Sequence, residues 1–194
     1  LSVAMKNRSA ILPIGRTRGE VYWWSNLGFF TTSRYYRDSL PTWVQGWNQR
    51  NPMRSLTGRP WELLKAEAAY PEGDELPAEA GRDGRNTFPH ALPADPATAA
   101  ALLPHFPWMD SLTLDIALSG IAALGIGSGG GSRTDLLSIS LSSVDEIGHD
   151  FGPDSRELHD MLLRLDGYLG WFLDSLAATT PGEPGTVWEV AALG

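Results

Sequence analysis

The chain has 194 residues, of which 42% are hydrophobic and 20% are charged, a composition that is typical of a globular domain and excludes a disordered chain. The 15 basic and 23 acidic side chains give a formal net charge of −8, which argues against a protein that binds nucleic acid through overall positive charge. Because cysteine is absent, disulfide frameworks, thiolate zinc sites and cysteine nucleophiles are excluded as well.

The start of the chain predicts a β-rich region followed by a short helix. The apolar run of residues 10–15 predicts a strand. Residues 20–24 and 28–32 are rich in aromatic side chains and flank a short polar turn, which is typical of a β-hairpin. A proline at the first helical position and a face of tryptophan and valine predict a helix over residues 40–51.

Residues 52–107 predict a long surface excursion. The segment is rich in proline, and residues 67–85 within it are acidic and rich in glycine, with little periodicity. These features favour irregular structure, with one helical turn near residues 61–65.

The rest of the chain predicts alternating helices and strands. A helix capped by Asp110 ends near residue 124, and residues 136–142 predict a strand with Leu and Ile on one face and Ser on the other. A second, longer helix is expected from the cap at Asp154 to about residue 178, and a second strand over residues 186–192. This order predicts an α/β fold with a parallel sheet.

An aspartate and a histidine follow the strand of residues 136–142. In α/β sheets, functional groups gather just past the carboxyl ends of strands. One helical turn or a compact loop would aim the side chains of Asp145 and His149 at one point, where a carboxylate oxygen and an imidazole nitrogen would suit Zn²⁺. The alternative is that Asp145 caps a turn and that His149 is an ordinary surface residue. The spacing alone leaves both interpretations open.

Two basic residues stand near the start of the chain. If the segment is extended, Lys6 and Arg8 point the same way and form a two-pronged clamp. An ammonium group beside a guanidinium group suits a tetrahedral oxyanion such as phosphate. The alternative is two solvated charges at the start of a strand.

Three other histidines could add a metal ligand. His159 falls within the long helix, where we expect it to face solvent. His90 and His105 fall in proline-rich segments, and the sequence predicts no role for either.

Taken together, four segments resemble the alkaline phosphatase superfamily, and within it the type I phosphodiesterase/nucleotide pyrophosphatase branch with its phosphate-irrepressible alkaline phosphatases. Residues 138–155, SISLSSVDEIGHDFGPDS, resemble the zinc-site segment of this branch. Residues 162–166, LLRLD, and residues 112–115, LTLD, also match it. Residues 6–11, KNRSAI, resemble the Lys-Asp-Arg stretch of the monoesterases.

The resemblance implies a zinc-dependent phosphate-ester hydrolase. Asp145 and His149 would bind one zinc ion of a two-zinc site, and Lys6 and Arg8 would contact the non-bridging oxygens of the phosphoryl group. Phosphoryl transfer would use a Thr or Ser nucleophile that the family places before the Lys-x-Arg stretch, and therefore outside this chain. A family Asp-His zinc pair corresponds here to Ala192 and Leu193, which cannot bind metal, through a truncation artefact, a sequence error or a true loss of ligands. Because the nucleophile and this pair are both missing, the chain alone is expected to be inactive even if its parent is active.

This interpretation divides the chain into two parts and predicts its binding partners and its location in the cell. Residues 1–109 would hold the substrate-binding strand with a hairpin and a loop-rich cap or insertion, and residues 110–194 an α/β core segment of an alkaline-phosphatase-like sheet flanked by helices. The expected partner is a small phosphate ester, with no nucleic acid and no membrane span. The resemblance implies a periplasmic or secreted protein.

Three alternative functions stay open. The first is a phosphodiesterase or nucleotide pyrophosphatase of the same superfamily. The second, of another class, is a binding or scaffold relative without a complete metal site. The third is an interaction module that binds a ligand through the tryptophans between residues 23 and 47.

Overall fold

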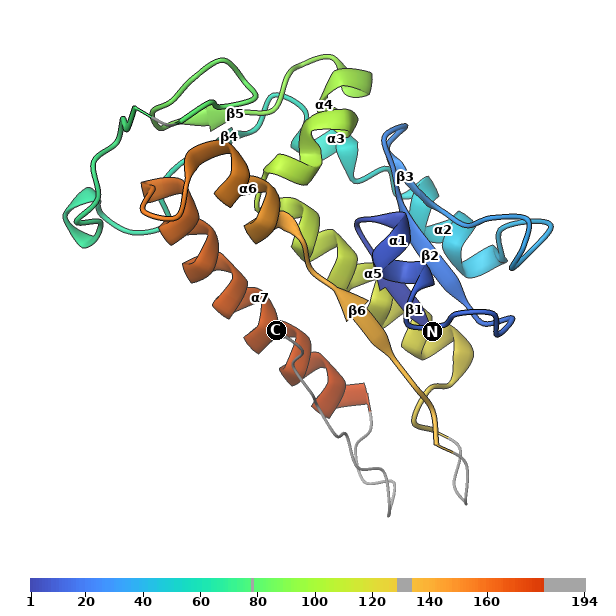
Figure 1. Cartoon of the computed structure of the whole chain (residues 1–194). Helices are drawn as coiled ribbons and strands as arrows, with labels where there is room; N and C mark the ends of the chain where they lie inside the picture. Colours follow the sequence, from blue (N-terminus) through green and yellow to red (C-terminus); the bar gives the residue numbers. More distant parts are fainter. Residues whose placement is uncertain (78, 129–133, 180–194) are drawn as a thin grey trace.

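The computed structural model describes residues 1–77, 79–128 and 134–179 (Figure 1). Within them, a four-stranded sheet has the order β3-β2-β1-β6. Its strands are β1 (Ser2–Ala4), β2 (Val21–Ser25), β3 (Phe29–Thr31) and β6 (Ser138–Ser140). Strand β1 pairs in parallel with β2 and β6, whereas β2 and β3 form an antiparallel hairpin. The α/β class is confirmed, with a mixed rather than a purely parallel sheet.

Helices cover both faces of this sheet. They are α1 (Asn7–Ile11), α2 (Thr42–Gln49), α3 (Met53–Leu56), α4 (Pro96–Leu102), α5 (Trp108–Leu124), α6 (Ser143–Phe151) and α7 (Arg156–Thr179). Side chains alternate along a strand, so β1 buries Val3 in the core shared with α5 and Ala4 against α1 on the other face. Strands that lie far apart in the sequence, β1 and β6, therefore pair in one helix-covered sheet.

The strand predicted at residues 10–15 is wrong. The first strand is β1, and the apolar run instead begins within α1, where Ala10 packs on Ala4 and Val21. A short apolar run suits either element, and its place over the sheet, rather than its sequence, decides the outcome.

The predicted hairpin and the helix after it are confirmed. Trp24 faces Phe30 across β2 and β3, and the ring of Phe30 meets Trp47 of α2 edge-on. Helix α2 starts at Thr42, because Pro41 takes the N-cap position rather than the first helical one. Trp24 and Trp47 are both buried in the core, and Trp24 also lines the open cleft described below.

The helical turn predicted near residues 61–65 is wrong. The excursion instead contains a two-stranded sheet, in which β4 (Pro60–Trp61) pairs with β5 (His90–Ala91), and 3₁₀ turns η1 (Glu67–Ala69) and η2 (Leu103–His105). Asp160 of α7 binds this segment at the indole of Trp61 and at the backbone NH of Leu64.

Asp160 accepts four short hydrogen bonds, three from the excursion and one from Arg164 of its own helix. Its buried carboxylate accepts them from the indole of Trp61, the backbone NH of Leu64, the hydroxyl of Tyr70 and the guanidinium of Arg164, at 2.6–2.7 Å. Three of these donors lie about 90 or more residues from Asp160 in sequence, so local patterns do not predict the contacts.

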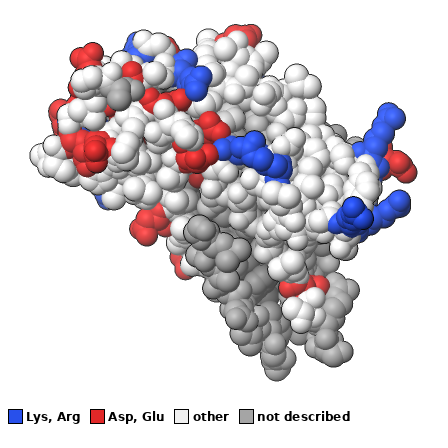
Figure 2. Space-filling view, in the orientation of Figure 1, with Lys and Arg blue, Asp and Glu red and all other residues white. Residues whose placement is uncertain are grey.

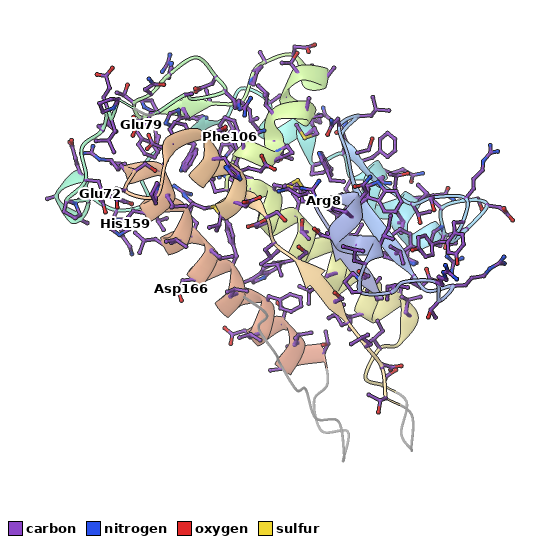
Figure 3. The ribbon with its side chains drawn as sticks, viewed as in Figure 1. Arg8, Glu72, Glu79, Phe106, His159 and Asp166 are labelled. Atoms are coloured by element: carbon purple, nitrogen blue, oxygen red, sulfur yellow. The ribbon has the colours of Figure 1, made fainter. Side chains whose placement is uncertain are left out.

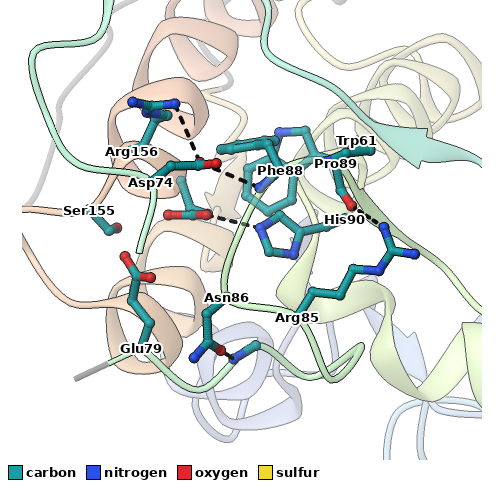
Figure 4. A network of polar contacts seen from close by, with 12 residues as sticks. Trp61, Asp74, Glu79, Arg85, Asn86, Phe88, Pro89, His90, Ser155 and Arg156 are labelled. Atoms are coloured by element: carbon teal, nitrogen blue, oxygen red, sulfur yellow. Dashed lines mark hydrogen bonds and ion pairs between the residues drawn. The ribbon is translucent and has the colours of Figure 1, made fainter. Parts of the chain in front are cut away.

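A second buried network binds the excursion to α7 (Figure 4). His90 is 1% exposed, and its ring nitrogens lie 2.9 Å from Glu157 and 3.3 Å from Asp83. Burial alone would lower the pKa of His90, but hydrogen bonds to Asp83 and Glu157 outweigh it and raise the pKa to about 9. His90 is therefore a buried cation between two carboxylates.

The sequence predicted that Asp110 caps the helix that follows it, and this prediction is wrong. Helix α5 starts two residues earlier, at Trp108. The buried Asp110 carboxylate instead accepts hydrogen bonds from the backbone NH groups of Ser142 and Ser143 and from the Ser143 hydroxyl, which fixes the start of α6. Burial, which outweighs these hydrogen bonds, raises the pKa of Asp110 to about 6.

The later elements agree with the predicted ones in type. Strand β6 lies within the predicted residues 136–142, and α7 matches the long helix. The strand predicted at residues 186–192 lies outside the described residues. Of the helices that the structure describes, none combines the length and apolarity needed to cross a bilayer.

Candidate functional site

Helix α6 presents Asp145 and His149 one turn apart on an exposed surface. The sequence leaves one helical turn or a compact loop open here, and the segment is a nine-residue helix. Asp145 Oδ1 lies 3.3 Å from His149 Nε2, and the two side chains are 55% and 75% exposed. The structure thus brings together the carboxylate and the imidazole that the sequence analysis singled out.

Lys6 reaches this pair from the opposite end of the chain. It occupies the N-cap position of α1, directly after β1, and the β1–β6 pairing carries it to the start of α6. Lys6 Nζ lies 2.5 Å from Asp145 Oδ2 and 2.9 Å from Glu146 Oε1. Burial lowers the pKa of Lys6, but these two carboxylates outweigh it and raise the pKa, while the hydrogen bond from Lys6 lowers the pKa of Asp145.

Arg8 lies beside Lys6, but not in the extended clamp that the sequence predicted. It is exposed on α1, so the alternation of an extended chain does not set its direction (Figure 3). Its positive charge still contributes to lowering the pKa of Asp145. Two cations and the Asp145–His149 pair therefore occupy one neighbourhood.

An open cleft of about 530 Å³ adjoins this cluster. On the face of the molecule that Figure 2 shows, basic and acidic side chains lie next to one another near the middle. The lining includes Lys6, Arg8, Trp23, Pro104, His105 and Glu146. Its size suits a small organic ligand, and its cations suit an anionic one.

The cluster continues along α6 to Asp150, which contacts residues for which the sequence analysis predicted no role. Asp150 is buried, and its two carboxylate oxygens lie 2.7 Å from His105 Nδ1 and 2.8 Å from Arg82 Nε. His105 Nδ1 also lies 3.8 Å from Glu146 Oε2. His105 and Arg82 lie 45 and 68 residues from Asp150 in the sequence, so no local spacing predicts that they contact it.

The expectation that His159 faces solvent is wrong. Its Nδ1 lies 3.0 Å from both carboxylate oxygens of Glu72, and its ring packs edge-on against Tyr70, so the side chain is only 31% exposed. His159 therefore holds the excursion against α7.

The donor set at the start of α6 fits part of a zinc site. A carboxylate and an imidazole that already converge are ligands that Zn²⁺ commonly takes. Three or four protein ligands are needed for tight binding, and the described residues contain no group of three or more candidate ligands. Ala192 and Leu193, the sites of the missing pair, lie outside the described residues.

Comparison with known proteins identifies relatives over most of the chain. The family model described as type I phosphodiesterase / nucleotide pyrophosphatase matches residues 3–181. The chain is 37% identical to alkaline phosphatase PhoV of Synechococcus elongatus over 184 residues, and 35% identical to alkaline phosphatase PafA of Elizabethkingia meningoseptica over 182 residues. These alignments cover 92% and 91% of this chain and 33% of each relative.

A solved structure gives the same result for the fold. The crystal structure of wild-type alkaline phosphatase PafA matches with a TM-score of 0.83 at 33% identity, covering 91% of this chain and 35% of that one. The chain thus spans about a third of the length of the relatives it matches.

Proposed function

Because this chain belongs to the type I phosphodiesterase / nucleotide pyrophosphatase family, we propose that it is a segment of a zinc-dependent phosphate-ester hydrolase that prefers monoesters. The observation that carries the proposal is the meeting of Lys6 with the Asp145–His149 pair beside a cleft that Arg8 also lines. Membership in the family and the alkaline phosphatases among its relatives support it.

Each of the four residues has a distinct role in this proposal. Asp145 and His149 would hold one of two zinc ions, which would supply Lewis-acid stabilisation of the reacting oxygens. Lys6 and Arg8 would bind the non-bridging oxygens of the phosphoryl group and balance the charge that shifts onto it during transfer. The nucleophile, a Thr or Ser by family resemblance, would come from a part of the parent protein that precedes this chain.

The preference for monoesters follows from charge. A terminal phosphoryl group is dianionic and a diester is monoanionic, so Lys6 and Arg8 attract the monoester more strongly. We expect the full-length protein to hydrolyse phenyl phosphate with a kcat/KM about tenfold or more above that for its methyl diester, a ratio that corresponds to ~1.4 kcal/mol.

Steady-state assays with both substrates measure this ratio, and the Lys6→Ala variant is the matched control that should narrow it. A clear diester preference would reject the monoesterase proposal in favour of the phosphodiesterase alternative, without affecting family membership.

A binding or scaffold role is the second candidate function. The observation that favours it is the partial metal site, because Asp145 and His149 have no third candidate ligand among the described residues. Sequencing the gene through and beyond codon 194 separates the two, since an Asp-His pair in place of Ala192 and Leu193 would exclude the metal-free role. From the family resemblance we also propose that the parent acts in the periplasm or outside the cell.

A further inference from the structure

We propose that Glu146 is a positioning residue that sets where the Lys6 ammonium lies, and that His105, which is fixed by Asp150, limits the movement of Glu146 by lying beside it. The inference rests on the proposed function, since it assigns to Lys6 the binding of a phosphoryl oxygen. It adds three residues that lie outside the Asp145–His149 pair and the two cations.

The contacts of Asp145 show why Lys6 needs a second partner. One carboxylate oxygen of Asp145 lies 3.3 Å from His149 Nε2, and the other lies 2.5 Å from Lys6 Nζ. If Asp145 and His149 bind a metal ion, that ion draws on the same carboxylate, and the hold of Asp145 on Lys6 weakens. Glu146, 2.9 Å from Lys6 Nζ, then remains as a partner dedicated to the ammonium.

Glu146 is itself confined. Its side chain is 23% exposed, and one oxygen contacts Lys6 while the other lies 3.8 Å from His105 Nδ1. His105 is fixed by its 2.7 Å contact with Asp150, whose side chain is 2% exposed and also contacts Arg82. His105, fixed by the buried Asp150, therefore lies beside Glu146 at a distance beyond a hydrogen bond, and Glu146 carries the direct contact with the Lys6 ammonium.

The geometry leaves Lys6 able to bind an anion. An ammonium group has three donors, of which Asp145 and Glu146 occupy two, so one remains for a phosphate oxygen. Lys6, His105 and Glu146 all line the cleft, which places this donor beside the space where an anion would enter. Holding a long, flexible side chain in place before binding reduces the entropy lost when the anion binds.

Two substitutions at Glu146 separate positioning from charge. Glu146→Gln removes the negative charge and keeps an oxygen that accepts a hydrogen bond from Lys6, whereas Glu146→Ala removes both. We expect Glu146→Ala to weaken the binding of inorganic phosphate to the full-length protein about 2- to 10-fold, the loss of one ordered side chain. Glu146→Gln should stay within about twofold of wild type.

The dissociation constant of inorganic phosphate, measured by titration calorimetry with and without added zinc, is the readout. Glu75→Ala is the matched control, since it removes the same charge from an exposed residue of the excursion. Tighter binding in both Glu146 variants would mean that Glu146 only repels phosphate, and unchanged binding in both would mean that it does nothing there; either result overturns the inference.

His105→Ala tests the rest of the network in the same titration, with the thermal unfolding midpoint as the folding control. Weaker phosphate binding supports the role of His105, and unchanged binding overturns it.

Lys6→Ala separates this inference from the proposed function. If it leaves phosphate binding unchanged, the proposed role of Lys6 fails; if it weakens binding while Glu146→Ala does not, only the positioning role fails.

Discussion

Replacing Lys6 with alanine is expected to lower kcat/KM for an aryl phosphate about 100- to 1,000-fold in the full-length protein, the loss usual for one preorganised electrostatic donor. Lys6 Nζ lies at the junction of α1 and α6, within hydrogen-bond distance of Asp145 and Glu146, and no other lysine or arginine of the described residues contacts Asp145 directly. Removal of the Lys6 ammonium takes away charge stabilisation that Arg8, an exposed residue of α1, does not replace.

The chain offers a matched control for this substitution. Lys65 is the only other lysine, and it is exposed in the excursion. Lys65→Ala should leave kcat/KM within about twofold of wild type, because an exposed charge outside the site contributes little. A Lys6→Ala enzyme that retains wild-type activity and a wild-type thermal unfolding midpoint would contradict the role given to Lys6.

The stability of the protein is expected to fall as the pH rises through about 9, because the buried His90 cation loses its charge there. The pKa of His90 is raised from 6.5 to about 9, so its contribution is fully present below pH 6.5 and is lost above the raised value. The loss is on the order of 3 kcal/mol, since each pH unit between the two pKa values is worth about 1.4 kcal/mol. Deprotonation leaves Asp83 and Glu157 buried without a compensating charge.

Thermal unfolding midpoints of wild type and of His90→Gln from pH 6 to 10 measure this effect. The variant should be less stable than wild type at pH 6 and should lose less stability between pH 6.5 and 10. His159→Gln, which removes a partly exposed histidine paired with Glu72, should still show the fall in stability near pH 9. Parallel profiles for wild type and His90→Gln would contradict the assignment of a buried cation.

Local patterns predicted the elements that local forces determine. The hairpin of β2 and β3 follows from two aromatic runs and a tight turn, in which Gly28 takes a φ of +92°. The convergence of Asp145 and His149 follows from their spacing once α6 is helical.

Contacts between distant residues account for the errors. Asp110 has the sequence context of an N-cap for its own helix, yet its carboxylate binds the start of α6, 32 residues later. Asp160, 99 residues after Trp61, binds the segment in which the sequence predicted a helical turn. Lys6 and Asp145 are 139 residues apart, so only the family resemblance, and not spacing, predicted that they share a site.

The zinc content of the purified full-length protein tests the central claim most directly. We predict about two zinc ions per chain in wild type, and about one in the Asp145→Asn/His149→Ala double variant, with the fold unchanged by circular dichroism. A wild-type protein without zinc, or a double variant that keeps its full complement, would show that the pair on α6 does not bind a metal and would contradict the proposed hydrolase site.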